Sequence, residues 1–483
     1  MKKLVSILLL LAMMLTVLVA CNGDKGKNEE TTPAAQGGSE GGEGEATTNL
    51  ILPARDLDGY EFRWLCCDKS YGIAYDEGEE YDDSSTSYKA GLQRDAEVKD
   101  KLNITFKDVK AGDGGTGNLT NYIVTDAMNP YSSFDVGNVG GPENLSQLVT
   151  QKLVADAASI PHLNLDQAWY QQQANEEYSV MGMQYFLAGA FPDFPGTPTF
   201  LFNKDMLLEL NLELPYDTII AGEWTIEKLV EYTAAGYKDL GTAGRDENDY
   251  FGYVGHDRSI CYFYQGMGGQ TTTRDENGAV VPVISNDTVD AIFTKVTEFY
   301  NQSQNWTNGS LDAGVHSSSH KMFYDGNGLF CYWITGTLDY SKIDTFERGV
   351  CILPKYDLDQ ENYKCPSVGG IKLFAANLEN DDYTGYIYEM LCEATLRIVY
   401  PATIQEAIDF EKLTDEGSIA VQKIVDQSIL FDILKNCDPS GILSSCGYVW
   451  YCISNKTTPS AAASSVQAVV ERQFSEFFYG KAE

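Results

Sequence analysis

Enzymatic chemistry needs nucleophiles, metal ligands or paired carboxylates at particular spacings, and this chain of 483 residues supplies few of them. It has 4 histidines, and His316 and His320 lack the glutamate that lies between the histidines of a zinc-binding HExxH helix. Neither a GxSxG turn for a nucleophilic serine nor a phosphate-binding GxxxxGK[ST] loop occurs in the sequence. We therefore expect a protein that is not an enzyme, without a metal or a cofactor.

Acidic residues outnumber basic residues by 70 to 34, which gives a formal net charge of -36. Binding to nucleic acid depends on lysine and arginine that neutralise phosphates, so this charge argues against a nucleic-acid partner. The acid-rich runs at residues 245–249 and 357–361 lack the glycine and terminal glutamate of a calcium loop, and we expect solvated loops there. A carboxylate pair of the glycosidase type stays open, because 70 acidic residues form some pairs by chance.

Besides Cys21, the chain has ten cysteines, and their spacing matches no disulfide framework. Several lie within apolar stretches, where a free thiol acts as a small hydrophobic side chain. Disulfides are common in exported proteins, so both states stay open at this stage. A pair among Cys437, Cys446 and Cys452 is the disulfide to test.

The N-terminus has the pattern of an export signal. Lys2 and Lys3 precede an apolar run over residues 4–20, and the small residue Ala20 stands directly before Cys21. Small residues before a cysteine resemble the bacterial lipobox, in which that cysteine is acylated, although a plain signal peptide with an incidental cysteine is the alternative. We expect a signal peptide at 1–20, a lipidated disordered tether at 21–50, and a body held at the extracytoplasmic face of the cell membrane.

The elements that must position any site follow the tether. Residues 60–66 alternate rings with polar residues as in a strand, residues 88–102 have helical spacing, and a second strand begins at 103–106. A helix near 119–128 and a strand at 134–136 repeat this order. Strand, helix, strand predicts a parallel sheet, whose ligand crevice lies beyond the carboxyl ends of the strands. The loops after Cys67, Lys107 and Val136 are expected to face it.

Eight stretches of the chain resemble segments of the bacterial extracellular solute-binding lipoproteins of carbohydrate ABC importers, and they follow one another in the same order as in that family. Three of them are LFNKD at 201–205, GEWTIEKL at 222–229 and CILPKY at 351–356, and the specificity for the family comes from all eight together. The others lie at residues 93–103, 134–136, 152–156, 163–170 and 415–418. Within these motifs, Thr225 also reads as a helix N-cap, and Lys204 as a charged residue on a rim, without any ligand.

The resemblance implies an α/β, two-lobed periplasmic-binding-protein type II fold with hinge strands between the lobes. One lobe would comprise residues 51–188 plus 350–401, and the other 189–349 plus 402–483. The chain would cross between them near 189–197, 349 and 400. A monomer of this kind captures a small-molecule carbohydrate and delivers it, unaltered, to the permease subunits of the transporter.

Sugars present apolar C–H faces and rings of hydroxyls, so their sites combine flat aromatic rings with planar polar groups. The 30 Tyr, 21 Phe and 6 Trp of this chain fit that need. Trp333 is the first candidate, because it lies where a strand of the family reaches the cleft. The further candidates are the aromatic residues Trp169, Phe191, Phe194 and Trp450 and the polar residues Asn138, Asp193, Arg258 and Asp325.

Each of these residues also has a structural interpretation, as core packing for a tryptophan and as surface exposure for a polar residue. The chain departs from the family at Gly189-Ala190, where relatives carry an acid after the glycine; either Asp193 substitutes or the ligand differs. Three other functions stay open. They are a surface-anchored glycan-degrading enzyme, a receptor partner or adhesin that binds without transport, and a binding protein for peptides or polyamines, whose cations would suit an acidic cleft.

Overall fold

The computed structural model describes residues 52–66, 86–112, 119–139, 144–188, 198–241, 245–256, 259–276, 278–309, 318–334, 345–367, 370–402, 415–435, 437–443 and 447–478. The predicted signal peptide, Cys21 and the tether therefore lie outside the described residues. In the part that is described, no helix combines the length and the apolarity needed to cross a membrane.

The first sheet has four strands in the order β12-β3-β1-β2. Its strands are β1 (Tyr60–Cys66), β2 (Ile104–Lys110), β3 (Val136–Val139) and β12 (Ile371–Phe374). β1 is parallel to both β2 and β3, as the strand, helix, strand order predicts, while β12 runs antiparallel to β3. The third strand begins at Val136, two residues later than expected, although the backbone N–H of Asp135 already donates to the carbonyl of Arg63 on β1 at 2.8 Å.

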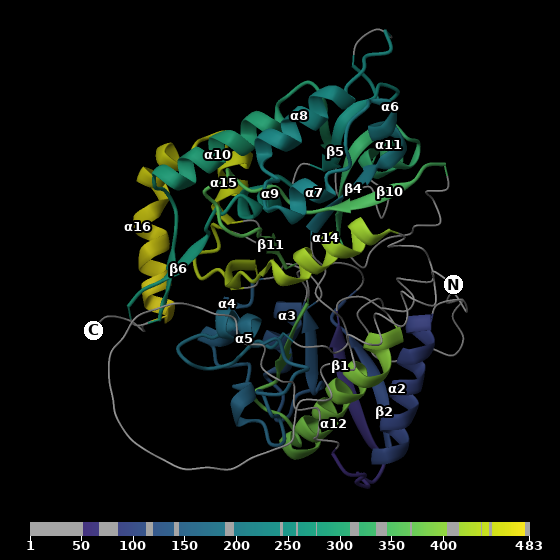
Figure 1. Cartoon of the computed structure of the whole chain (residues 1–483). Coiled ribbons are helices and arrows are strands. Elements are labelled where there is room, and N and C mark those ends of the chain that lie inside the picture. Colours follow the sequence, from purple (N-terminus) through teal and green to yellow (C-terminus); the bar gives the residue numbers. More distant parts are fainter. Residues whose placement is uncertain are drawn as a thin grey trace, which may run out of the picture. The chain divides into compact units, whose positions relative to one another are not determined.

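Two helices pack against each other beside the first sheet, α2 (Thr86–Leu102) and α12 (Asp381–Ala394), shown in Figure 1 with β1 and β2. The predicted helix is present, but its buried face holds Ala90, Val98 and Leu102, whereas Leu92, Ala96 and Lys99, the residues whose spacing predicted the helix, are exposed. α12 is buried on almost every side and continues into a π-helix, η5 (Thr395–Val399), which also contacts α2. Segments almost 300 residues apart in sequence therefore form one layer.

The second sheet has five strands in the order β10-β4-β9-β5-β8. Its strands are β4 (Pro198–Asn203), β5 (Phe251–His256), β8 (Asn305–Gly309), β9 (Gly328–Ile334) and β10 (Arg348–Cys351). β5 is parallel to β8 and β9, whereas β4 is antiparallel to both of its neighbours. β4 and β5 are buried along their whole length, as expected of strands covered on both faces.

The remaining elements surround and connect the two sheets. The helices are α3 (Leu119–Asp126), α4 (Ser146–Thr150), η2 (Ala157–Ser159), α5 (Gln172–Tyr178), α6 (Lys204–Glu209), α7 (Tyr216–Ile220), α8 (Ile226–Gly236), α9 (Ser259–Gly266), α10 (Asp287–Tyr300), α11 (Ser318–Tyr324), α14 (Glu416–Gln427), η6 (Ile433–Lys435), α15 (Gly447–Ser454) and α16 (Pro459–Phe478). Two small two-stranded sheets pair β6 (Thr272–Arg274) with β7 (Val280–Pro282), and β11 (Cys365–Pro366) with β13 (Ile429–Leu430).

The chain returns from the second sheet to the first between β10 and β12, because β10 pairs with β4 and β12 pairs with β3. β11 lies on this connection and pairs in parallel with β13, which follows α14. The lobe boundaries near residues 189, 350 and 402 stay a prediction.

Two of the family-like motifs meet in the fold. Lys204 donates to the Asp415 carboxylate at 2.6 Å, and Asp415 also caps α14 by accepting the backbone N–H of Ser418 at 2.9 Å. Burial alone would raise the pKa of Asp415, but the Lys204 ammonium and the capping bonds outweigh it and lower this pKa. The interpretation of Lys204 as a charged residue on a rim is therefore wrong, since it is buried in a structural ion pair.

Thr225 caps α8 as predicted. Its side-chain oxygen accepts the backbone N–H of Lys228 at 3.4 Å.

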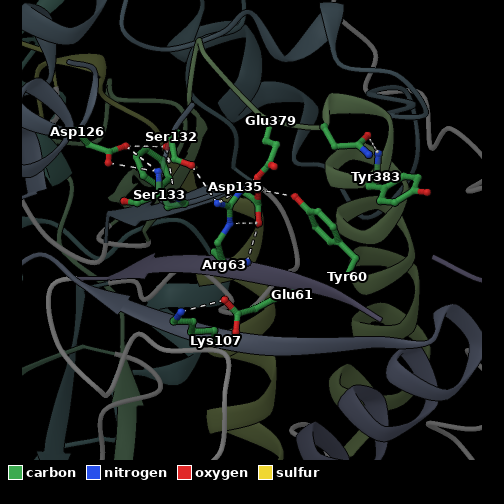
Figure 2. Close-up of polar contacts among 12 residues, drawn as sticks. Tyr60, Glu61, Arg63, Lys107, Asp126, Ser132, Ser133, Asp135, Glu379 and Tyr383 are labelled. Atoms are coloured by element: carbon green, nitrogen blue, oxygen red, sulfur yellow. Dashed lines mark hydrogen bonds and ion pairs between the residues drawn. The ribbon is translucent and has the colours of Figure 1, made fainter. Parts of the chain in front are cut away.

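A buried ion pair links β1 to the start of β3 (Figure 2). The Arg63 guanidinium donates to both carboxylate oxygens of Asp135, at 2.7 Å from Nη2 and 3.2 Å from Nε. The same carboxylate accepts the backbone N–H of Arg63 at 2.7 Å and the Tyr60 hydroxyl at 2.8 Å. Because every lone pair of Asp135 faces a donor, the pair fixes how the Asp135 segment lies against β1.

We predict that Asp135→Ala lowers the free energy of unfolding by about 3 kcal/mol, since it removes the buried partner of the Arg63 guanidinium, whose side chain is only 16% exposed, and leaves only the exposed Glu379 at 3.7 Å as an acidic neighbour. Glu61 of β1 and Lys107 of β2 form the control pair, which is likewise made by side chains of neighbouring segments of the first sheet. Their side chains are 50% and 55% exposed, so Glu61→Ala should cost less than about 1 kcal/mol. Urea unfolding of both variants measures the difference, and equal losses would contradict the role given to Asp135.

Candidate functional site

Two polar residues, Asn138 and Lys372, lie opposite one another at the edge of the first sheet where its parallel strands end. β3 ends at Asn138 and Val139, and the antiparallel β12 begins beside them, so Asn138 and Lys372 are opposite one another. Both side chains are fully buried. Asn138 therefore lies where a crevice residue is expected, although its own side chain is covered. The loop at 67–85, predicted to face the crevice, is outside the described residues, and β2 extends through Lys107 to Lys110.

The carboxyl edge of the second sheet carries an aromatic cluster around the end of β9. The Trp333 ring lies against His320 and Tyr324 of α11, with ring centroids 4.5 and 6.3 Å away. His320 and Tyr324 are four residues apart and so share one face of that helix. We call the group formed by residues 256, 262, 320, 324, 332 and 333 the β9 aromatic cluster.

The other half of the β9 aromatic cluster surrounds Tyr332. The His256 ring, at the end of β5, meets the Tyr332 ring edge to face at 4.7 Å. The Tyr262 ring stacks on Tyr332 at 5.5 Å with an interplanar angle of 5°. The backbone carbonyl of Tyr332 in turn lies 3.2 Å from His320 Nε2. Two of the 4 histidines in the chain thus serve as ring partners at this edge.

Trp333 has an unused donor. The residue is 3% exposed, and its indole Nε1 is buried without a hydrogen-bond partner in the described structure. A buried N–H left without an acceptor costs about 1–3 kcal/mol relative to a bonded one. An acceptor supplied by a ligand, such as a hydroxyl oxygen, would recover that energy. The β9 aromatic cluster can therefore offer a neutral polar ligand one directed N–H and the half-buried rings of Tyr262, His320 and Tyr324, whereas the rings of Tyr332 and Trp333 are themselves buried.

The sequence made Trp333 a candidate but did not indicate the residues that surround it. His256 and His320 were considered only as metal ligands, and within the described residues no group of three or more His, Cys, Asp or Glu could hold a metal ion. The four-residue spacing of His320 and Tyr324 was the signal that could have indicated a shared helix face. The approach of His256 and Tyr262 to Tyr332 has no such local signal, because different segments supply these rings.

The other predicted site residues are dispersed. Trp169 is buried in the core of the first sheet, with its ring centroid 6.5 Å from that of Tyr170. Trp450, on α15, is half-buried against the core of the second sheet. Asp325 precedes β9 and is exposed in an ion pair with Lys321, so it lies at the end of the strand opposite to Trp333. Phe191, Asp193, Phe194 and Arg258 lie outside the described residues.

A cavity of about 210 Å³ lies elsewhere, among Ser179, Met181, Gly182, Arg274, Gly278, Ala279 and Phe478. Its cation, Arg274, donates to the backbone carbonyls of Glu176, Glu177 and Gly278 at 2.8–3.0 Å. The guanidinium is therefore already bound to the protein, and no described strand of the two main sheets ends in this cavity. The β9 aromatic cluster is the better candidate site.

Comparisons with known proteins identify the fold. No protein-family model and no curated protein matches the chain. Solved structures do match over most of its length. A cyclo/maltodextrin-binding protein complexed with maltotetraose is 12% identical, with 87% of this chain and 97% of that chain covered and a TM-score of 0.55.

Two further structures are similar to the chain. The protein CpMnBP1 with mannotriose bound is 14% identical, with 85% and 100% of the two chains covered and a TM-score of 0.53. An ABC substrate-binding protein from Listeria monocytogenes in complex with cycloalternan is 13% identical, with 88% and 100% covered and a TM-score of 0.54. These likenesses confirm the predicted α/β fold of the periplasmic-binding-protein type II class.

The described cysteines include six free, buried thiols, Cys331, Cys351, Cys365, Cys392, Cys437 and Cys452. A disulfide between Cys437 and Cys452 is therefore wrong, and Cys446 lies outside the described residues. Burial raises the pKa of both the Cys365 and the Cys452 thiol to about 12. Because the thiolate is the reactive form, these side chains act as small hydrophobic residues in the core.

We predict that Cys437 and Cys452 resist alkylation by iodoacetamide in the native protein and react fully once guanidinium unfolds it. Peptide mass spectrometry of samples kept free of reductant measures both states, and a reductant should leave the melting temperature unchanged. Isolation of a cross-linked peptide that joins residues 437 and 452 would contradict the assignment.

Proposed function

We propose that this protein is the substrate-binding component of an ABC importer and captures a sugar or oligosaccharide for delivery to a membrane permease. The observation that carries the proposal is the β9 aromatic cluster, which ends a strand at the carboxyl edge of the second sheet. The fold supports it, because structures with this fold include proteins bound to maltotetraose, mannotriose and cycloalternan.

The ligand would bind by ring contact and hydrogen bonding, and no covalent bond would change. Trp333 would donate its indole N–H to a ligand oxygen, and the rings of His320 and Tyr324 would hold the indole in place. Asn138 would contribute from the first sheet. The candidates Phe191, Asp193, Phe194 and Arg258 would complete the site from segments outside the described residues, whereas Trp169 and Trp450 would support it from the cores.

The mechanism would be a shift between an open and a closed arrangement of two lobes, 51–188 plus 350–401 and 189–349 plus 402–483. A ligand that contacts both lobes binds the closed arrangement more tightly and so increases its population. The closed form would then dock on the permease. Removal of residues 1–20 and acylation of Cys21 would hold the monomer at the extracytoplasmic face of the membrane, and residues 22–50 would serve as its tether.

We predict that at least one oligosaccharide raises the melting temperature of the protein, because a ligand that binds only the folded state stabilises it by about 2.7 kcal/mol at a concentration of 100 times Kd. Thermal-shift measurements with maltotetraose, mannotriose, cycloalternan and a wider glycan panel test this. Trp333→Phe keeps an aromatic ring but removes the N–H, and should weaken the affinity for that glycan about tenfold.

Trp306→Phe is the matched control. The Trp306 indole N–H is also buried and without a partner among the described residues, but its ring lies with Phe251 and Arg245, away from the β9 aromatic cluster. The control variant should bind with unchanged affinity. An unchanged melting temperature across the whole panel would contradict the proposed function, and an equal loss in both variants would contradict the role of Trp333.

A further inference from the structure

A carboxyl group lies in the core between α12 and the segment that precedes α5. Glu389 of α12 is 1% exposed. One of its oxygens, Oε2, accepts the Tyr170 hydroxyl at 2.5 Å, and the other, Oε1, accepts the backbone N–H of Asn164 at 3.2 Å. Two donors from one short segment therefore converge on a single buried side chain of a helix more than 200 residues further along the chain.

No cation compensates this carboxylate within the described structure, where Glu389 forms no ion pair. The titratable groups that face it are Tyr170 from the preceding segment, Tyr388 and Cys392 from α12, and Lys372 from β12, which acts on the Cys392 thiol. From α2, Arg94 and Asp95 approach α12 near its end, but they pair with each other, and Arg94 also donates to Thr395.

The protonation state of Glu389 changes near neutral pH. Burial raises its pKa from 4.5 to about 7, and the hydrogen bonds from Tyr170 and Asn164, with a contribution from Trp169, keep it from rising further. Near pH 5 the buried group is neutral, and above pH 7 it is a charge that only hydrogen bonds stabilise.

The segment held by Glu389 leads to the predicted crossing between the lobes. Directly after Tyr170, the backbone N–H of Gln171 donates to the carbonyl of Ala188 at 3.1 Å. The N–H of Ala188 donates to the side-chain oxygen of Asn175 at 2.9 Å. Leu187 forms two backbone hydrogen bonds of 2.8 Å with Lys372 of β12. Ala188 is the last described residue before the predicted crossing at 189–197.

We propose that Glu389 is a pH-sensitive positioning residue, which fastens the segment 163–188 to α12 while it carries a proton and loosens that segment when the proton is lost. Opening of the segment would expose Glu389 to water, where its carboxyl group ionises without penalty. The inference concerns the protein without ligand, so it stands or falls independently of the proposed sugar.

The direction of the pH dependence follows from proton linkage. The packed segment holds the proton more tightly than the opened segment, with pKa values of about 7 and 4.5 for Glu389. The stabilisation that protonated Glu389 gives to the packed segment is therefore fully present below about pH 4.5. It is lost as the pH rises toward 7. The opening constant should rise up to roughly tenfold per pH unit within this window and level off above it.

Hydrogen exchange of the full chain without ligand tests the proposal. Peptides from residues 163–188 are followed between pH 5 and 8 by mass spectrometry, with correction for the intrinsic exchange rate at each pH. We expect opening in the wild type to rise with pH as described, and opening in Glu389→Gln to be independent of pH, because the amide has no proton to lose.

Two further variants separate this role from simple packing. Tyr170→Phe removes a donor that lowers the pKa of Glu389, so the pH at which opening levels off should move upward. Glu393→Gln is the matched control one turn along the same helix, where the side chain pairs with Arg397 at 2.7 Å and leaves Glu389 intact. Its pH profile should match that of the wild type.

The proposal would be overturned by a flat profile in the wild type, by a pH-dependent profile in Glu389→Gln, or by loss of the pH dependence in Glu393→Gln. If Glu389→Gln fails to fold, the Tyr170→Phe profile decides, because a downward or absent shift of its plateau is incompatible with titration of Glu389.

Discussion

Burying a charge or a polar group requires a partner, and in this protein that requirement joins segments that are distant in sequence. Arg63 and Asp135 link β1 to the start of β3, while Lys204 and Asp415 link the first residue of α6 to the cap of α14. An unpaired charge at either place would cost several kcal/mol, which the marginal stability of a folded chain does not tolerate. The sheets and helices are therefore held in place by polar contacts as well as by apolar packing.

Because buried polar groups need partners, two groups that lack a full set of partners in the described structure indicate a function. The indole N–H of Trp333 is buried without an acceptor in the described structure, at the sheet edge where a ligand is expected. Among the described residues, Glu389 has hydrogen-bond donors but no counter-charge, which is why we propose that its protonation affects the packing of the segment 163–188. In our proposals, Trp333 contributes to ligand binding, and Glu389 controls how the packing of the segment 163–188 depends on pH.

Local patterns predicted the parallel strands of the first sheet, and the family resemblance predicted the fold class, but neither predicted most of the β9 aromatic cluster. Alternating rings at 60–66 and helical spacing at 88–102 reflect periods of two and 3.6 residues, which do not depend on distant contacts. Trp333 was found from a motif, whereas His256 and Tyr262 were not, because their contacts with Tyr332 are made across separate segments. Lys204 appeared to be a rim residue for the same reason, since its partner lies 211 residues away.

By itself, the sequence determined the acidic charge, the order of strands and helices between residues 60 and 136, and the scarcity of residues suited to catalysis, because these follow from composition and short-range spacing. Only the tertiary structure decided which rings surround Trp333, that Cys437 and Cys452 are separate thiols, and that Tyr170 and Glu389 share a hydrogen bond. The physical reason is that burial and pairing depend on neighbours in space. Chain folding brings those neighbours together from positions that no local pattern connects.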